Sequence, residues 1–389
     1  MDRRLLVIIL TLIVNLIGFG IMIPLLPLYA RSFGASETVI GLIIATFSLS
    51  QLIASPMLGA LSDRVGRRPV LLLSLIGTAV SFVMMALAGS VPMLFAARLV
   101  DGFSGGNIST ARAYIADITA EDDRAKAYGL IGAAFGIGFV LGPALGGALG
   151  HLGYTAPIWA AAALTLVATA LAWVWLPETV HRGSASPGPF WAGLRAAFGH
   201  RLLRPLLIVD FAYWTASALF QGTFALVTAH RFGFGVPQVG YILALFGMLG
   251  VFVQVGLVGR VVSALGERRV FALGLLLSAV GLGGAALARS VPGFLLFLVP
   301  YAIGSALCTP VLSSLISRTA ASDTQGTVQG AASAIESLGR TVGPVWGTTV
   351  LQHVGDASAF GTSAVLFAGA MLFFLGTRQR GDVSSRAAA

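Results

Sequence analysis

Long apolar segments recur along almost the whole chain. Each has about 20 residues or more, the length at which an α-helix crosses the hydrocarbon core of a lipid bilayer. Short connections that carry Gly, Pro, Ser or charged residues separate these segments, as turns between helices require. The sequence therefore predicts an all-α membrane protein with twelve transmembrane helices, at residues 5–30, 37–57, 69–90, 92–116, 127–149, 156–177, 205–229, 237–258, 270–288, 292–316, 326–351 and 358–377.

The scarcity of charged residues excludes a soluble fold. Charged residues make up 10% of the chain and hydrophobic residues 57%, whereas about a quarter of a typical soluble domain is charged. The single cysteine, Cys308, permits no disulfide within the chain, and the five histidines are far apart. We therefore predict no metal site, no cofactor and no catalytic residues. The only lysine, Lys126, is not part of a phosphate-binding loop, so the energy for any transport must come from a gradient.

The basic residues predict the orientation in the membrane. With the N-terminus in the cytoplasm, 18 of the 24 Lys and Arg residues lie on the cytoplasmic side, and three lie outside, namely Arg31, Arg231 and Arg289. Cytoplasmic connections of membrane proteins are rich in Lys and Arg. We therefore predict a multi-pass protein of the cell inner (cytoplasmic) membrane with both termini in the cytoplasm. The net charge of +9 is scattered between apolar segments, so no nucleic-acid partner is predicted.

The two halves of the chain repeat each other at an offset of 200 to 201 residues. The matching pairs are Gly59 with Gly259, Gly66 with Gly266, Gly142 with Gly343 and Pro143 with Pro344. A parallel repeat of six spans predicts two six-helix bundles related by an axis along the membrane normal, with a substrate cavity between them. The predicted parts are a bundle at 1–177, a cytoplasmic linker at 178–204, a second bundle at 205–377 and a cytoplasmic tail at 378–389. Because twelve helices suffice for a complete transporter, we predict a monomer.

A motif follows the second predicted span. It reads Gly59-Ala60-Leu61-Ser62-Asp63-Arg64-Val65-Gly66-Arg67-Arg68 and resembles the signature of the major facilitator superfamily between helices two and three. The resemblance implies a gate formed by Gly59, Asp63, Arg64, Gly66, Arg67 and Arg68, in which Arg67 pairs with Asp117 at the inner end of the fourth span. In the simpler interpretation the arginines only enforce the orientation, but this leaves the glycines and Asp63 unexplained.

Two further motifs resemble those of the twelve-helix drug/proton antiporters. The fifth span contains Gly138, Gly142, Pro143, Gly146 and Gly147 in the spacing G-x-x-x-G-P-x-x-G-G. The first span contains the spacing G-x-x-x-P-x-x-P, which is similar to that of tetracycline exporters in particular. This resemblance implies outward transport, whereas a general packing surface of small residues is the alternative. Tetracycline exporters carry acids in helices one and nine, where this chain has Asn15 and the neutral stretch Leu276-Leu277-Ser278.

Ionisable residues inside a membrane span are costly and are therefore functional candidates. Arg98 and Asp101, three residues apart, either assist proton transfer, as in the similar helix-four motif of the family, or form a self-neutralising structural pair. Asp210 either faces a wet cavity and carries a proton or lies near the membrane interface. Glu336 and Arg340, four residues apart, either form a plain salt bridge or let Glu336 alternate between Arg340 and a proton or cationic substrate.

Polar residues within the spans are candidates for the substrate cavity. Trp214 and Gln221 follow Asp210 at helical spacing and so share a stripe with it. Lipid would penalise such a stripe, which favours its exposure to a wet cavity. The complete set of cavity candidates is Asn15, Gln51, Asn107, Trp214, Gln221, Gln254 and Arg340.

These features favour a secondary active transporter that exports small amphiphilic drugs in exchange for protons by alternating access. An alternative is a transporter of a specific metabolite or organic anion that is coupled differently or uncoupled. A third hypothesis is a sensor or structural membrane protein on the same fold, but such a protein has no need of a gate. The expected partners are a small-molecule substrate, protons and the lipid bilayer.

Overall fold

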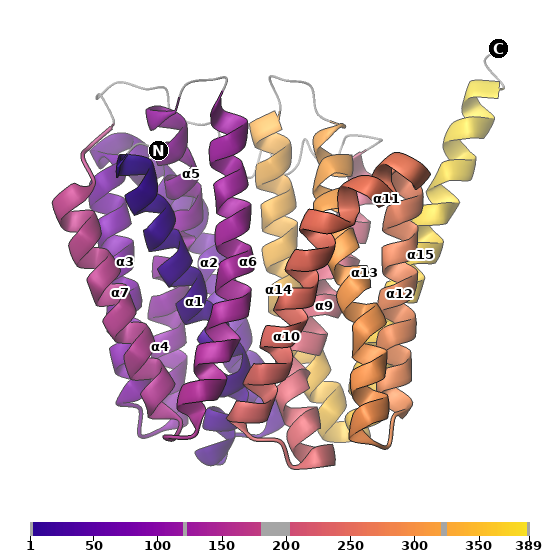
Figure 1. Cartoon of the computed structure of the whole chain (residues 1–389), viewed down its shortest axis with the longest axis horizontal. Coiled ribbons are helices and arrows are strands. Elements are labelled where there is room, and N and C mark those ends of the chain that lie inside the picture. The colour runs from indigo at the N-terminus through magenta and orange to yellow at the C-terminus, as the bar shows by residue number, and fades with distance from the viewer. Residues whose placement is uncertain (1–2, 120–122, 180–202, 320–324, 387–389) are drawn as a thin grey trace. The chain divides into compact units, whose positions relative to one another are not determined.

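The structure is a computed structural model that describes residues 3–119, 123–179, 203–319 and 325–386 (Figure 1). All regular elements within these residues are helices, which confirms the predicted all-helical fold. The chain divides into two compact units, one formed by Met1–Pro187 and Phe224–Gly247 and the other by Gly188–Thr223 and Met248–Ala389. We call these unit 1 and unit 2 and describe each by itself.

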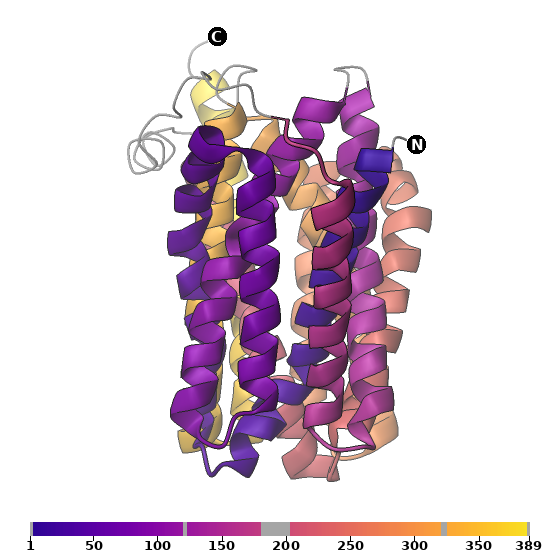
Figure 2. The same cartoon turned by 90° about the vertical axis from the view of Figure 1, so that its left-hand side faces the viewer.

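Unit 1 is built mainly from the first half of the chain. Its helices are α1 (Arg3–Ser32), α2 (Glu37–Val65), α3 (Arg67–Ala86), α4 (Val91–Ser104), η1 (Gly105–Asn107), α5 (Ile108–Ile118), α6 (Arg124–Gly150) and α7 (Thr155–Trp175). Within it, α1 packs against α6 and α7, while α3 packs against α4 and α7. Figure 2 shows these indigo-to-magenta helices running side by side. Buried side chains such as Ile8, Leu75, Tyr114 and Ala172 form a core shared by α1, α3, α5 and α7.

Unit 2 is built from the second half of the chain. Its helices are α11 (Val258–Leu265), α12 (Glu267–Leu287), α13 (Val291–Ser317), α14 (Gln325–Val354) and α15 (Asp356–Arg386). Two helices pass from one unit to the other, α9 (Leu203–Phe232) after Thr223 and α10 (Val236–Gly256) after Gly247. Aromatic rings fill the core of unit 2: Phe220 lies 4.5 Å from Tyr301 and 5.5 Å from Phe360, measured between ring centroids.

Local residues define where the helices begin and end. Ser36 caps α2 by accepting a hydrogen bond from the Val39 amide at 3.4 Å, as Ser commonly does at helix N-termini. Gly66, which separates α2 from α3, has a φ of +112° that an L side chain rarely adopts. Gly266 separates α11 from α12 in the same way, with a φ of +79°.

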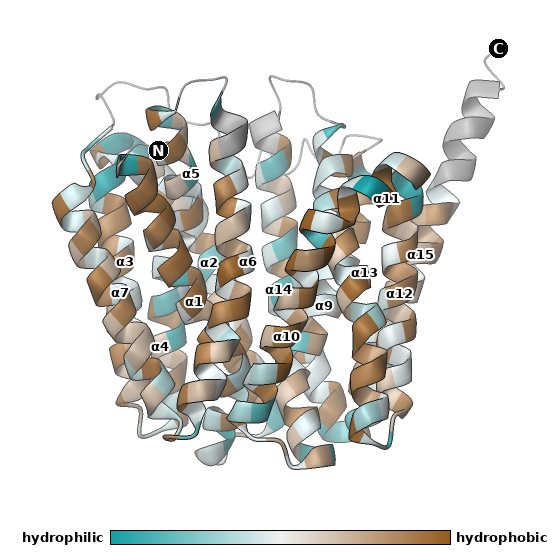
Figure 3. Ribbon diagram, viewed as in Figure 1, coloured by the Kyte–Doolittle hydropathy of each residue, from teal (hydrophilic) through white to brown (hydrophobic). Residues whose placement is uncertain are grey.

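Ten helices within the described ranges are long and apolar enough to cross a membrane. These are α1, α2, α3, α6, α7, α9, α10, α12, α13 and α15. The predicted span at 326–351 forms the long helix α14, but polar and charged residues lower its hydropathy, as the paler and teal stretches in Figure 3 show. The predicted twelve spans therefore remain a prediction for α14 and for the interrupted helix at 92–116.

The helix expected at 92–116 is not continuous, which corrects the prediction. It is divided into α4, η1 and α5, with the 3-10 turn at Gly105–Asn107. Two consecutive glycines are weak helix formers, and a Cβ at Gly106 would lie 3.0 Å from the backbone nitrogen of Ser55 on α2. The Gln51 side chain donates a hydrogen bond of 2.9 Å to the Gly105 carbonyl oxygen. The interruption thus allows close packing against α2, and α2 satisfies its exposed carbonyl.

Candidate functional site

The predicted gating motif lies mostly on a helix, because α2 continues to Val65 and does not end at residue 57 as predicted. Gly59 and Asp63 belong to the last turns of α2, and only Gly66 interrupts the chain before α3 begins at Arg67. The Arg64 side chain, also on α2, is exposed. The rigid helix end therefore determines where Asp63 points, and the single residue Gly66 makes the turn.

Arg67 is the centre of an ionic network in unit 1. It forms an ion pair with Asp63, one helical turn earlier. Its Nε lies 3.4 Å from Asp117 Oδ2, so the structure brings together the pair that the family resemblance implied. Its Nη1 also donates to the Ser62 hydroxyl at 2.7 Å. The network connects the end of α2, the start of α3 and the end of α5.

Glu178 completes this network and was missed by the sequence analysis. Its carboxylate accepts hydrogen bonds from the backbone amides of Arg67 at 2.9 Å and Arg68 at 3.2 Å, at the N-terminus of α3. A Cβ on Gly66 would collide with this carboxylate. The next residue, Thr179, donates to Asp117 Oδ2 at 3.1 Å. The acid after the sixth span was visible in the sequence, but its target lies 110 residues away.

Removing the Glu178 carboxylate is expected to destabilise unit 1. Glu178→Ala leaves the first amides of α3 without their acceptor, and loss of a helix N-cap costs about 0.5–2 kcal/mol. Glu178→Gln retains one acceptor oxygen, and we expect it to lose less than Glu178→Ala. Unfolding in mixed micelles with increasing denaturant measures both variants. Equal stability of Glu178→Ala and wild type would contradict this account.

Arg68 is held differently from its neighbour. Its Nη2 donates a 2.6 Å hydrogen bond to the Trp173 carbonyl oxygen near the end of α7. The same guanidinium lies 5.8 Å from the centroid of the Trp173 ring, within the range of a cation–π interaction. Arg68 therefore anchors the start of α3 to α7 and does not join the pair between Arg67 and Asp117.

The glycines of the fifth-span motif form a close helix crossing in unit 1. A Cβ on Gly142 would lie 2.6 Å from the Gly20 Cα on α1, and one on Gly138 would lie 2.9 Å from the Leu16 carbonyl carbon. A Cβ on Gly147 would lie 3.0 Å from the Pro237 carbonyl oxygen at the start of α10. Gly146 is less tightly packed, with its nearest atoms at 3.4 Å. The motif thus lets α6 approach two helices at backbone distance.

The corresponding glycines of the second half form an equivalent crossing in unit 2. A Cβ on Gly343 of α14 would lie 2.8 Å from the Leu219 amide nitrogen of α9, and one on Gly222 would lie 3.0 Å from the Pro344 Cβ. The repeat read from the sequence is therefore a repeat of helix packing.

Arg98 and Asp101 form a buried ion pair on α4 in unit 1. The two residues are 3% and 5% exposed, respectively. The Arg98 guanidinium also lies 4.3 Å from the centroid of the Phe47 ring on α2. Because the two charges neutralise each other, the geometry accommodates the structural interpretation, and a role in proton transfer stays a prediction.

Asp210 lies at the centre of a polar cluster in unit 2. It is 1% exposed, so in this structure its side chain faces neither bulk water nor an open, wet cavity. The Trp214 side chain, one helical turn later, lies near its carboxyl group, and Glu336 and Arg340 on α14 are near enough to interact with it electrostatically. Its Oδ2 is buried and has no hydrogen-bond partner among the described residues.

Arg340 holds the other side of this cluster. Its Nη2 lies 3.8 Å from Glu336 Oε2, which is too long for a strong ionic hydrogen bond. Its guanidinium lies 4.9 Å from the centroid of the Trp214 ring. Asp210, Trp214, Glu336 and Arg340 therefore bring two acids, one cation and an indole together between α9 and α14. The sequence predicted each residue but did not show that they meet.

The remaining cavity candidates are distributed over several helices. Gln51 uses its amide to bind Gly105 on the interrupted helix, Asn15 and Gln221 are half-buried on α1 and α9, and Gln254 is exposed on α10. Asn107 lies in η1, and its side chain is outside the described part of the structure.

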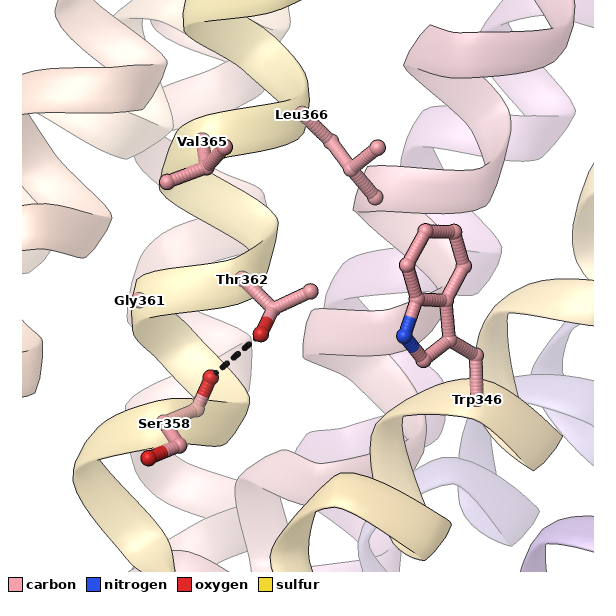
Figure 4. A pocket seen from close by; sticks show the side chains of 6 residues that line it. All are labelled: Trp346, Ser358, Gly361, Thr362, Val365 and Leu366. Carbon is pink, nitrogen blue, oxygen red and sulfur yellow. Dashed lines mark hydrogen bonds between the residues drawn. The ribbon is translucent and has the colours of Figure 1, made fainter. Parts of the chain in front are cut away.

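A shallow groove in unit 2 lies between α14 and α15 (Figure 4). It is lined by Trp346, Ser358, Gly361, Thr362, Val365 and Leu366. The Thr362 hydroxyl donates to the Ser358 carbonyl oxygen at 2.7 Å, so this polar group is already satisfied within its own helix. Val365 is 70% exposed. Such an open apolar surface is typical of the lipid-facing side of a membrane helix, and we do not assign it to the substrate.

Comparisons with known proteins identify the family of this chain. The sequence profile of the Major Facilitator Superfamily matches residues 8–260 and 211–389. The chain is 33% identical over 390 residues to the tetracycline resistance protein, class C, of Escherichia coli, covering 98% of this chain and 97% of that protein. It is 30% identical over 345 residues to multidrug resistance protein 2 of Bacillus subtilis (strain 168), covering 86% of this chain and 85% of that protein. The crystal structure of the human organic anion transporter MFSD10 (TETRAN) shares 28% identity at a TM-score of 0.74, covering 96% of this chain and 99% of that one.

These matches establish the family of the protein. The chain belongs to the major facilitator superfamily, as the motif at Gly59–Arg68 predicted. It is a multi-pass membrane transporter related to tetracycline and multidrug resistance proteins, and it is not an enzyme.

Proposed function

We propose that the protein exports small amphiphilic drugs in exchange for protons, by alternating access, as a monomer in the cell inner membrane. Twelve spans would form two bundles at 1–177 and 205–377, with the linker 178–204, the tail 378–389 and both termini in the cytoplasm. The relatives named for tetracycline and multidrug resistance support the substrate class. The distribution of basic residues supports the orientation.

The buried cluster around Asp210 is the observation that carries this proposal. An ionised carboxylate without a full set of partners is unstable away from water. Asp210 can therefore bind a proton when its surroundings exclude water and release the proton when water reaches it. Proton relays in membrane transporters are built from such acids. Glu336 and Arg340, which carry opposite charges, lie near Asp210, so movement of either residue changes the electrostatic surroundings of its carboxyl group.

The position of this cluster fits the departures from the tetracycline exporters. Asn15 and Ser278 cannot carry a proton, so coupling through helices one and nine is not available to this chain. Asp210 and Glu336 supply two acids on α9 and α14 instead. The buried pair of Arg98 and Asp101 on α4 is a second place where a proton can be exchanged.

The network around Arg67 supports a gate on the proposed cytoplasmic side. Asp63 and Asp117 hold the Arg67 side chain between two helices, and Glu178 fixes the backbone at the same point. Side chains in such a network have alternative partners, as a two-state element requires. The tight crossings at Gly142 and Gly343 keep the helices rigid while the gate moves.

A second candidate function is export or uptake of organic anions. The similarity to the human organic anion transporter MFSD10 favours it. Arg340 is partly exposed and only loosely paired with Glu336, at 3.8 Å, so an anionic group of a substrate can compete with that glutamate. In this case the coupling would be different or absent.

Everted membrane vesicles distinguish the two candidates. Vesicles from a bacterial strain without its own drug exporters would be energised with a proton gradient and given tetracyclines, lipophilic cations, neutral drugs or aromatic carboxylates. The proposal predicts accumulation of tetracyclines or lipophilic cations that stops when an uncoupler collapses the gradient. Accumulation of carboxylates alone, insensitive to the uncoupler, would favour the second function.

A further inference from the structure

The second half of the chain contains an ionic network at the position that corresponds to Arg67 and Asp117. Adding the repeat offset of 200 to 67 gives Glu267, the first residue of α12. Adding 201 to 117 gives Arg318, the residue after α13. The same two offsets relate Gly66 to Gly266 and Gly142 to Gly343. Corresponding positions in the two halves therefore carry opposite charges.

The residues in the second half make direct contacts. Arg318 Nη2 lies 2.9 Å from Glu267 Oε1. The Ser314 hydroxyl donates to the same oxygen at 2.9 Å. The Glu267 side chain is 15% exposed, whereas Arg318 is open to solvent. The ion pair thus connects the start of α12 to the end of α13, as Arg67 and Asp117 connect the start of α3 to the end of α5.

A neighbouring contact shows that the two networks occupy equivalent places. Arg68 donates to the Trp173 carbonyl oxygen and lies against the Trp173 ring. Arg268, at an offset of 200, donates to the Phe374 carbonyl oxygen at 3.4 Å and lies 4.7 Å from the centroid of the Phe374 ring. Here the charge is the same in both halves. The architecture is therefore repeated, and only the ion pair beside it is reversed.

The helix dipole gives a physical reason for the difference. The N-terminus of a helix favours a negative charge and disfavours a positive one. In the second half Glu267 itself supplies the acid at the start of α12. In the first half α3 begins with two arginines, and the acid comes from Glu178, more than a hundred residues later. The residue that corresponds to Glu178 at an offset of 200 is Arg378. Each half thus places one acid at the N-terminus of the corresponding helix, Glu178 at α3 and Glu267 at α12, but the two acids come from different positions in the sequence.

The second half lacks the charge that the gate proposal assigns to Asp63. The corresponding residue, Ser263, donates a 2.8 Å hydrogen bond to the Arg260 carbonyl oxygen within α11. Ala264 stands where the first half has Arg64. The second network therefore keeps the contact between two helices and lacks the second charged partner that Asp63 provides for Arg67.

We propose that Glu267, Ser314 and Arg318 form a charge-inverted counterpart of the Arg67 network, in which Glu267 is a positioning residue that holds the start of α12 during transport. The proposal rests on the proposed function in using transport as its readout and in treating the Arg67 network as a gate. The two networks would then have different roles. The Arg67 network opens and closes during transport, whereas the Glu267 network stays closed and holds α12 against α13.

Charge reversal in the full-length protein tests this proposal. We would measure exchange of radiolabelled tetracycline across the membrane of proteoliposomes for Glu267→Arg, Arg318→Glu and the double variant. In the double variant the charges of the pair have the same order as those of Arg67 and Asp117. Each single variant is expected to lower the maximal rate about ten-fold, because it replaces an attraction by a repulsion, and the double variant to recover to within about three-fold of wild type. The KM is expected to change less than about two-fold, because neither residue belongs to the cluster around Asp210 that the proposed function uses.

The controls separate the pair from the general charge of this surface. Arg269→Glu reverses an exposed neighbour and is expected to retain the wild-type rate, as is Arg318→Lys, which keeps the positive charge. Unchanged rates in the single variants, or a double variant as slow as the slower single, would overturn the proposal. If Glu267→Arg does not fold, Glu267→Gln and Arg318→Gln take its place. Their losses must then be non-additive, because both remove the same interaction, and additive losses would overturn the proposal.

Exchange also separates this proposal from the proposed coupling. It needs no proton gradient, so a wild-type protein that exchanges substrate but does not couple to protons still reports on Glu267 and Arg318. If tetracycline is not exchanged by the wild type, the first compound accumulated in the everted vesicles replaces it as the probe.

Discussion

Asp210→Asn is expected to abolish uphill export and to leave downhill exchange of substrate intact. An amide of the same shape cannot bind and release a proton near neutral pH, so proton-driven accumulation should fall by roughly ten-fold or more. The substitution removes an ionisable group that is almost completely buried and whose Oδ2 is unpartnered among the described residues. It should therefore not reduce folding. Accumulation and exchange, measured in the same proteoliposomes, separate coupling from the ability to alternate.

Thr223→Val is the matched control for Asp210→Asn. Thr223 is also buried on α9, and its hydroxyl donates to the Leu219 carbonyl oxygen of the same helix at 2.8 Å. Its loss changes polarity without removing a charge, and we expect uphill export within about two-fold of wild type because such intrahelical bonds contribute little. Uphill export by Asp210→Asn at the level of this control would exclude Asp210 as the proton carrier and leave Glu336 and Asp101 as the next residues to test.

Gly142→Ala is expected to cause a large loss of stability in unit 1. The new Cβ would lie 2.6 Å from the Gly20 Cα and 2.7 Å from the Ile17 carbonyl oxygen, both backbone atoms of α1. Neither can move without displacing the helix, so the cost is about 1–3 kcal/mol or more. The amount of monodisperse protein after solubilisation, and its unfolding in mixed micelles, measure the effect.

Gly132→Ala on the same helix provides the comparison. No atom lies within 4 Å of a Cβ built at Gly132, and Ala is favoured over Gly in a helix by up to about 1 kcal/mol. We expect this variant to be as stable as wild type or slightly more so. If both variants lose stability equally, the glycines of α6 serve flexibility and not the close crossing with α1.

Much of the fold could be predicted from the sequence because apolar length and motif spacing are local properties. The interruption at Gly105–Asn107 could not, since paired glycines are equally compatible with a continuous, closely packed helix. Its cause is tertiary: the backbone of α2 lies against Gly106, and Gln51 satisfies the Gly105 carbonyl. The connection predicted between the second and third spans is also too long. Asp63 and the arginines are charged and are therefore typical of a loop, whereas α2 continues to Val65.

The individual residues of the site could be predicted from the sequence, but which of them lie beside one another could not. Asp63 and Arg67 stand in a motif whose spacing can be recognised, whereas Glu178 reaches its partners only through the packing of α7 beside α3. Asp210 and Glu336 are separated by more than a hundred residues, and no spacing rule places them together. Their meeting depends on the crossing of α9 and α14 at Gly343. The repeat indicated that such a crossing would exist, but not which side chains would lie beside it.

The central claim, that proton uptake at Asp210 drives export, is tested most directly by following the pH inside proteoliposomes that contain the purified protein. A pH gradient would be imposed, and tetracyclines, lipophilic cations and neutral drugs would be added one at a time to wild type and to Asp210→Asn. The account predicts that at least one compound triggers proton movement in the wild type and that the same compound triggers none in Asp210→Asn. Substrate flux through the wild type without any movement of protons would contradict it.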